Sequence, residues 1–212
     1  AYMINSIVFD LGGVVQGLDW SPVVNSLLDI DESLDVDSHR AAFYYDRPNY
    51  FDLYSVGKIS KEDFWRMVAS RLCIDIKHVD RLSESFELIY SFVNFDLLRI
   101  IEQIKKKYNL FVLSNACPEI ENKVVKDNIY VHLFDKIYFS HNIGFKKPEK
   151  EAYLHITENN EVSPEECLFI DNDMKNIISA QDIGINSILY KGIEPLKKDL
   201  YEMLNVKCKD RV

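Results

Sequence analysis

The sequence predicts an α/β protein, a doubly wound and mostly parallel sheet that carries an inserted bundle of α-helices. Before residue 18 and after residue 94, short apolar runs alternate with amphipathic segments, as in parallel strands joined by helices. Residues 18–94 have helical periodicity and no convincing long strand. We therefore expect a Rossmann-like core domain formed by residues 1–17 and 95–212, interrupted by a helical cap domain at residues 18–94.

The first predicted strand, residues 4–9, is a short apolar run that ends at Asp10 and is followed by Gly12 and Gly13. A carboxylate at the end of a buried strand is costly to place unless it meets water, a metal or a substrate. Parallel sheets bind their ligands at this end of the strands, and glycine lets the backbone approach a ligand closely. Asp10 is therefore a candidate functional residue, and the alternative is a strand that simply ends in a tight turn.

Three stretches of the inserted part carry an apolar face at helical spacing. They are Val23, Val24, Leu27 and Leu28; Ile59, Phe64, Met67, Val68 and Leu72; and Val79, Leu82, Phe86, Leu88 and Ile89. Ser60, with Asp63 three residues later, predicts the start of the second helix in an arrangement close to a capping box. Because this bundle follows the first strand, we expect it to form a lid above the carboxyl edge of the sheet.

The remainder of the chain predicts four further strands with helices between them. The strands are 110–114, 137–139, 167–170 and 186–190, and the helices are 97–108, a segment starting at 118, 149–157, 174–183 and 195–204. Pro118 is well placed in the first turn of its helix, and Gly184 ends the helix at residues 174–183. Residues 140–148 are predicted to form a loop.

Composition restricts the class of partner. The formal net charge of −9 argues against a nucleic-acid backbone or an anionic membrane as the main partner, but it leaves room for a small anionic substrate. The four cysteines form no C-x-x-C pair, and the five histidines lack metal-ligand spacing. No apolar run is long enough to span a membrane, and no signal peptide is recognisable. We expect a cytoplasmic protein, a monomer or a homodimer, with reduced thiols.

Polar side chains follow each of the first four predicted strands, where they would converge on one edge of the sheet. In chain order they are Asp10; Ser114 with Asn115; Lys147; and Asp171 with Asn172 and Asp173. Any one of these positions alone would be a weak indication, because strand ends and helix caps are often polar. The ordered set of acid, hydroxyl, lysine and acid is a much stronger one.

This set resembles the haloacid dehalogenase-like superfamily of hydrolases. The first motif is V-F-D-L-G-G-V at residues 8–14, and the second is the Ser-Asn pair at residues 114–115. The third is G-F-K-K-P at residues 144–148, and the fourth is I-D-N at residues 170–172 followed by Asn176. The resemblance spans the whole chain, including the helical cap inserted after the first strand.

The resemblance implies a Mg²⁺-dependent phosphohydrolase that acts on a small phosphorylated metabolite. Asp10 would be the nucleophile and would form an aspartyl-phosphate that water later hydrolyses. A carboxylate that attacks an anionic phosphate faces charge repulsion, which a Mg²⁺ ion would relieve. The implied metal ligands are Asp10, the Gly12 carbonyl and the cluster of Asp171, Asn172 and Asp173.

The same resemblance implies a phosphate site. Ser114, Asn115 and Gly13 would bind the phosphoryl oxygens, and Lys147 would neutralise charge on the nucleophile and the phosphate. Lys146 is interpreted as its solvated neighbour, because the motif places the catalytic lysine directly before the proline.

Two positions depart from the family pattern. Gly12 stands where the family's phosphatases usually carry a second Asp that acts as general acid and base, a function typically worth roughly 10²–10⁴-fold in rate. Asn172 stands where a metal-binding carboxylate is usual. Two alternatives therefore stay open: a metal-independent 2-haloacid dehalogenase in which Asp10 attacks carbon, and a weakly active or non-catalytic phosphate-binding regulatory protein.

Three further residues have two interpretations each. Asp173 is either part of the metal cluster or the cap of the following helix. Asp19 and Arg47 face the active site from the lid junction or lie on the surface. The sequence of residues 18–94 contains no pattern that identifies the substrate.

Overall fold

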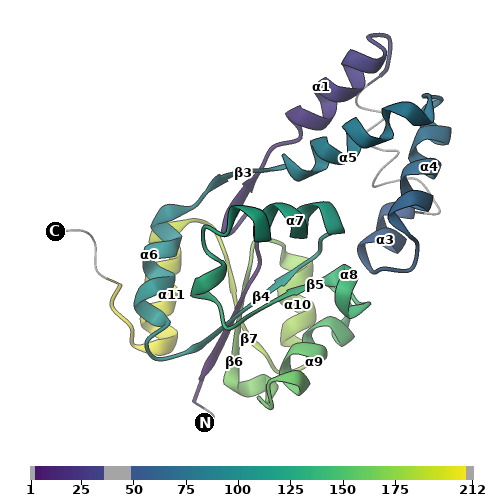
Figure 1. Cartoon of the computed structure of the whole chain (residues 1–212). Coiled ribbons are helices and arrows are strands. Elements are labelled where there is room, and N and C mark those ends of the chain that lie inside the picture. The colour runs from purple at the N-terminus through teal and green to yellow at the C-terminus, as the bar shows by residue number, and fades with distance from the viewer. Residues whose placement is uncertain (1–2, 36–48, 209–212) are drawn as a thin grey trace.

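A computed structural model describes residues 3–35 and 49–208 (Figure 1). At its centre lies a sheet of five parallel strands in the order β5-β4-β1-β6-β7. The strands are β1 Ser6–Phe9, β4 Asn109–Ser114, β5 Lys136–Phe139, β6 Cys167–Asp171 and β7 Asn186–Leu189. The predicted doubly wound parallel sheet is therefore confirmed. Because β1 has β4 on one side and β6 on the other, its carboxyl end is the point where the strand order reverses, the usual ligand site of such sheets.

Helices cover both faces of this sheet, and the alternation of side chains along β1 shows why. Ile7 and Phe9 face one hydrophobic cluster, whereas Val8 between them faces the other. The first cluster includes residues of α6 Phe95–Ile104, α7 Pro118–Asp127 and α11 Ile193–Leu204, and the second includes residues of α9 Lys150–Asn159 and α10 Met174–Gln181. Single-turn 3₁₀ helices lie at Ile76–His78, Val131–Leu133 and Pro164–Glu166.

A two-stranded antiparallel ribbon joins this core to the inserted helices. It pairs β2 Gln16–Leu18 with β3 Tyr90–Val93, and between them come α1 Ser21–Ile30, α3 Tyr50–Ser55, α4 Lys61–Leu72 and α5 Val79–Glu87. We call residues 19–89 the helical insert; its described helices lie above the carboxyl edge of the sheet in Figure 1. The sequence prediction missed the ribbon, since each strand is too short to show a convincing alternation.

Local sequence explains several boundaries. Ser60 accepts a hydrogen bond from the Asp63 amide at 3.0 Å and starts α4, as predicted. The prediction of a loop at residues 140–148 was partly wrong, because Ser140–Ile143 forms the short helix α8. Gly144 ends that helix with φ +81°, a backbone conformation that favours glycine.

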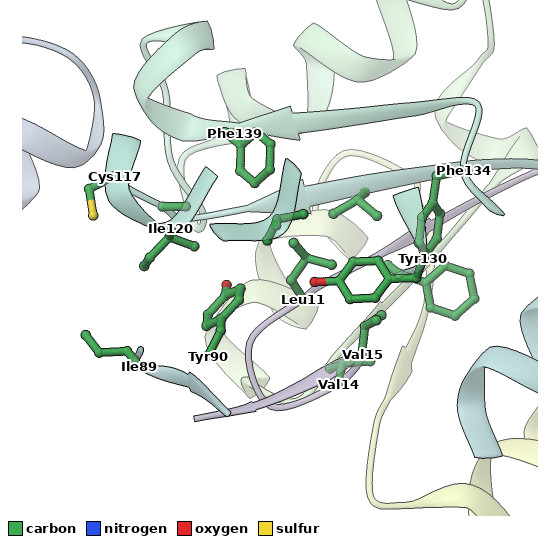
Figure 2. Close-up of a cluster of buried hydrophobic side chains, with 14 of the residues drawn as sticks. Leu11, Val14, Val15, Ile89, Tyr90, Cys117, Ile120, Tyr130, Phe134 and Phe139 are labelled. Atoms are coloured by element: carbon green, nitrogen blue, oxygen red, sulfur yellow. The ribbon is translucent and has the colours of Figure 1, made fainter. Parts of the chain in front are cut away.

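Figure 2 shows the buried cluster beside the ribbon, which includes Leu11, Val14 and Val15 from the turn after β1 and Tyr90 of β3. The Tyr130 hydroxyl donates to Gln16 Oε1 at 2.5 Å in the same region. This packing fixes the turn that follows Asp10. Among the described helices, none is both long and apolar enough to cross a membrane.

Candidate active site

The carboxyl ends of β1, β4 and β6 and the loop after α8 surround a cavity of about 410 Å³. Seven of the predicted site residues line it: Asp10, Gly12, Ser114, Asn115, Lys147, Asn172 and Asp173. The helical insert closes the other side with residues that include Trp20, Phe51, Asp52 and Ser55. Gly13 and Asp171 are not part of the lining. The sequence prediction therefore found the position of this cavity and most of its polar wall.

A buried lysine joins two buried carboxylates at the base of the cavity. Lys147 Nζ lies 2.6 Å from Asp10 Oδ1 and 2.8 Å from Asp171 Oδ2, and the three residues are 3%, 8% and 0% exposed. Such a group is stable only because its charges compensate one another and its hydrogen bonds are satisfied. The Leu11 amide also donates to Asp10 Oδ1, at 2.8 Å. Both of these contacts involve Oδ1 of Asp10, so neither of them occupies Oδ2.

Burial and charge shift the protonation equilibria of this group. Burial raises the pKa of Asp10 to about 6, against the lowering effect of Lys147 and with a further rise from Asp171. Burial alone would lower the pKa of Lys147, but the two carboxylates outweigh it and the net direction is upward. Lys147 is therefore a permanent cation at neutral pH, and Asp10 is a carboxylate held at a cost in desolvation.

This cost predicts a pH-dependent difference in stability between the wild type and Asp10→Asn. The carboxyl pKa rises from 3.8 in the unfolded chain to about 6 on folding. Its stabilising contribution is thus complete below about pH 4 and is lost as the pH rises through 6. We expect Asp10→Asn to be more stable than the wild type at pH 7, by on the order of 1–3 kcal/mol, and equally stable near pH 4. Urea unfolding in EDTA at both pH values measures this, and an equal difference at the two would contradict it.

Both carboxylate oxygens of Asp171 accept hydrogen bonds from the protein, so its predicted role as a metal ligand gains no support from the geometry and stays a prediction. Its Oδ1 accepts from the Asp173 amide at 2.7 Å, and its Oδ2 accepts from Lys147 Nζ and from Asn176 Nδ2 at 3.0 Å. Since β6 extends through Asp171, its side chain lies at the buried end of the sheet rather than in the loop. Its position fits it to hold Lys147 in place.

The side chain of Asn115 also holds Lys147, through the backbone of the lysine. Its Nδ2 donates to the Lys147 carbonyl and its Oδ1 accepts from the Lys147 amide, both at 2.8 Å. The Asn115 side chain therefore aligns the lysine loop with β4, and the predicted contact of this residue with phosphate stays a prediction. Ser114 is almost completely buried and lines the cavity. Its Oγ lies 3.2 Å from the hydroxyl of Tyr90, a cavity residue that the sequence prediction missed.

The two glycines after Asp10 have different surroundings. The Gly13 amide donates to the Gln16 carbonyl at 2.8 Å, so the predicted contact of Gly13 with phosphate is not supported. Its φ is +82°, and a Cβ there would overlap the Asn172 amide, so this turn requires glycine. A Cβ at Gly12 would lie 3.3 Å from the Tyr90 hydroxyl and from the Leu18 side chain. The ribbon therefore leaves little room for a side chain at position 12.

The oxygen donors on the cavity wall suit a Mg²⁺ ion. Asp10, Asn172 and Asp173 line the cavity together with Gly12, and carboxylate, amide and carbonyl oxygens are hard ligands. Asp173 also caps α10, because its side chain accepts a hydrogen bond from the Lys175 amide at 2.9 Å. The structure is therefore compatible with both interpretations of Asp173, as a helix cap and as a member of the metal cluster. Across residues 3–35 and 49–208, no group of three or more His, Cys, Asp or Glu is arranged to hold a metal. A Mg²⁺ ion would therefore depend partly on water and phosphate oxygens, as is usual for this ion.

Lys146 is more than a solvated neighbour. It forms an ion pair with Asp52 of α3, and both residues line the cavity. This contact could not be predicted, because no sequence pattern linked α3 to the lysine loop. Asp19 lies outside the cavity lining and accepts from the Ser21 amide at 2.9 Å, which supports its surface interpretation. Arg47 lies outside the described residues.

Comparison with known proteins adds relatives with related folds. The chain is 27% identical to D-ribitol-5-phosphate phosphatase of Bacteroides thetaiotaomicron, over 96% of this chain and 100% of that protein. A predicted HAD-like family hydrolase from Porphyromonas gingivalis superposes with a TM-score of 0.79 at 23% identity, over 97% and 100% of the two chains. A HAD family enzyme of Bacteroides thetaiotaomicron, solved in complex with magnesium and inorganic phosphate, gives 0.76 at 22% identity, over 89% and 94%.

A sequence model of the haloacid dehalogenase-like hydrolases matches residues 61–190, which is more than half of the chain. The matched region includes Ser114 and Asp171, at the ends of β4 and β6, and Lys147 in the loop after α8. Asp10 precedes the matched region, but β1 lies between two strands of it in the sheet. With the parallel sheet, the lysine between two carboxylates and this match, the chain belongs to the haloacid dehalogenase-like hydrolase family.

Proposed function

We propose that this protein is a Mg²⁺-dependent phosphatase of a small phosphorylated metabolite and that it works through an aspartyl-phosphate on Asp10. The observation that carries the proposal is the buried pair of Asp10 and Lys147, which places a carboxylate and a fixed cation together at the base of one cavity. The 27% identity to a D-ribitol-5-phosphate phosphatase over nearly the whole chain supports a phosphate ester as the substrate.

In the proposed reaction, Asp10 Oδ2 attacks phosphorus while Lys147 remains on Oδ1. A bond forms between Oδ2 and phosphorus, and the bond from phosphorus to the ester oxygen breaks. The ester oxygen leaves with the electron pair and takes a proton from water, because position 12 offers no carboxylic acid. Water then attacks the phosphorus of the aspartyl-phosphate and loses a proton to the solvent, and the bond between phosphorus and Oδ2 breaks. This step releases inorganic phosphate and restores the Asp10 carboxylate.

The residues around this reaction have separate functions. Lys147 offsets the negative charge that gathers on Asp10 and the phosphoryl oxygens, and Asp171 and Asn115 hold it in place. Ser114 lines the cavity, and its hydroxyl would donate to a phosphoryl oxygen. When bound, Mg²⁺ supplies Lewis-acid stabilisation of the phosphoryl charge, with Asp10, the Gly12 carbonyl, Asn172 and Asp173 as its candidate ligands.

The helical insert is proposed to act as a cap that selects the substrate. The cavity of about 410 Å³ lies at the small end of the usual range for small-molecule sites. Asp52 and Ser55 of the insert offer polar atoms, and Trp20 and Phe51 offer apolar surface. This mixture fits the hydroxyl groups and the carbon chain of a polyol or sugar phosphate, the class to which the substrate in the relative's name belongs.

The two alternative functions make different demands on the same cavity. A dehalogenase would use Asp10 against carbon and would need no cation, yet Asn172 and Asp173 add oxygen donors to the wall beside Gly12. A non-catalytic phosphate-binding protein would not need a nucleophile held at a cost in desolvation. The oxygen donors, together with the buried cation Lys147 beside Asp10, favour the phosphatase.

An assay of small phosphate esters with and without Mg²⁺ tests the proposal. We expect phosphate release from polyol or sugar phosphates that requires Mg²⁺ and is lost on adding EDTA. Chloride release from 2-chloropropionate without added metal would support the dehalogenase instead. Phosphate binding without turnover of any ester would support the regulatory alternative.

A further inference from the structure

A second buried carboxylate, Glu119, lies outside the cavity and has no part in the proposed reaction. It belongs to the first turn of α7 in the core domain, shortly after Ser114, and its exposed fraction is 0%. Burying a carboxylate is costly unless donors compensate the lost water, so a fully buried Glu requires an explanation.

Three hydrogen-bond donors to its side chain come from the helical insert. The Tyr54 hydroxyl of α3 donates to Oε2 at 2.7 Å, and Trp65 Nε1 of α4 donates to Oε1 at 2.8 Å. The Ser83 hydroxyl of α5 donates to Oε1 at 2.9 Å. A single carboxylate of the core therefore joins three separate helices of the insert. Lys61 Nζ, on a half-exposed side chain, approaches to 3.6 Å.

The surroundings of Glu119 strengthen these bonds. The Tyr54 ring stacks on Phe64 at 4.4 Å, and the Trp65 ring meets Phe86 edge to face at 4.9 Å, so the donors project from an aromatic cluster. Hydrogen bonds to a charged acceptor in such an apolar environment are stronger than neutral ones at the surface. Burial alone would raise the pKa of Glu119, but Trp65, Tyr54 and Ser83 outweigh it and hold the pKa below its usual value. The carboxylate therefore stays ionised.

Helix α3 connects this joint to the cavity. Tyr54 binds Glu119, while Phe51, Asp52 and Ser55 of the same short helix form part of the cavity wall. The end of α3 also contacts the core, because the Ser140 hydroxyl donates to the Ser55 carbonyl at 2.5 Å. The position of α3 above Asp10 is thus set by its contacts with α7 and α8, the latter adjacent to it in Figure 1.

We propose that Glu119 is a positioning residue that holds the helical insert closed over Asp10 and so sets the recognition of the part of the substrate beyond its phosphate. The kinetic consequence rests on the proposed function, whereas the structural consequence does not. The experiment therefore has one measurement without turnover and one with turnover.

The measurement without turnover is hydrogen exchange of the whole protein carrying Glu119→Gln. The Gln amide would present N–H donors where the insert also presents donors. We expect exchange about tenfold faster in α3, with β4 and β6 unchanged. Wild-type exchange in α3, or an equal increase throughout the chain, would overturn the proposal. This result stands even if the protein hydrolyses no phosphate ester.

The measurement with turnover compares Tyr54→Phe with a matched control, Tyr138→Phe. Tyr138 is equally buried and its hydroxyl accepts from Asn160 Nδ2 at 2.7 Å, but it lies in β5, away from the insert. We expect Tyr54→Phe to raise KM for a polyol phosphate several-fold while leaving KM for acetyl phosphate unchanged, and Tyr138→Phe to alter neither. If KM changed in both variants in proportion to their loss of Tm, the proposal would be overturned.

Discussion

Asp10→Asn is expected to abolish phosphate release, with a loss of roughly 10⁴-fold or more in kcat. An amide cannot form the acyl-phosphate bond, and Lys147 would still pair with Asp171, so the fold survives the change. Initial-rate assays at saturating Mg²⁺ measure the effect.

The matched control for this variant is Asp19→Asn. It makes the same chemical change on an exposed carboxylate that lies outside the cavity lining. We expect this control to keep wild-type kcat. If Asp10→Asn kept more than about a tenth of wild-type turnover, the nucleophile would have to be another residue.

Lys147→Met is expected to damage both turnover and stability. Removing the cation leaves Asp10 and Asp171 buried without a charge partner, and breaking a buried pair in this way typically costs about 3–5 kcal/mol. The Asp10 pKa would then rise further and the developing phosphoryl charge would lose a stabilising group, so we expect a loss of roughly 10²–10³-fold in kcat. Urea unfolding and initial rates measure the two effects.

The neighbouring lysine is the control for the stability effect. Lys146 is only partly buried and pairs with one exposed carboxylate, so Lys146→Met should cost less than about 1 kcal/mol. Adding Asp10→Asn to Lys147→Met should restore part of the lost stability, because one of the stranded charges is removed. A Lys147→Met protein as stable as the wild type would contradict this account of the buried group.

The sequence was sufficient to predict the sheet and the edge of it at which most of the candidate residues gather. Short apolar runs identified the strands, and polar residues at the ends of β1, β4 and β6 could only meet at one edge of a parallel sheet. Seven of the predicted residues do line the same cavity. These features depend on local patterns and on the fixed geometry of parallel strands, which a sequence displays directly.

The detailed function of each residue could not be predicted in the same way. The site contains three residues that are adjacent in sequence, Asp171, Asn172 and Asp173. Because β6 ends at Asp171, this residue is buried against Lys147, whereas Asn172 and Asp173 are exposed and line the cavity. The family resemblance assigned Asn115 and Gly13 to phosphate, whereas in the structure the Asn115 side chain bonds to the Lys147 backbone and the Gly13 amide bonds to the Gln16 carbonyl.

Contacts between residues far apart along the chain could not be predicted from the sequence. Glu119 and Asp52 resemble ordinary charged residues in the first turns of helices, where acids are favourable. Their partners lie far away along the chain, in the insert for Glu119 and in the lysine loop for Asp52. Such pairs can be recognised only when the packing of the insert on the core is known.

The most direct test of the central claim is to trap the covalent intermediate. The protein is mixed with a phosphate ester and Mg²⁺, quenched in acid during turnover, reduced with sodium borohydride and digested for mass spectrometry. An aspartyl-phosphate is reduced to homoserine, so homoserine at position 10, absent when substrate is omitted, is the predicted result. An unmodified Asp10 under conditions of rapid turnover, or homoserine at another position, would contradict the claim that Asp10 is the nucleophile.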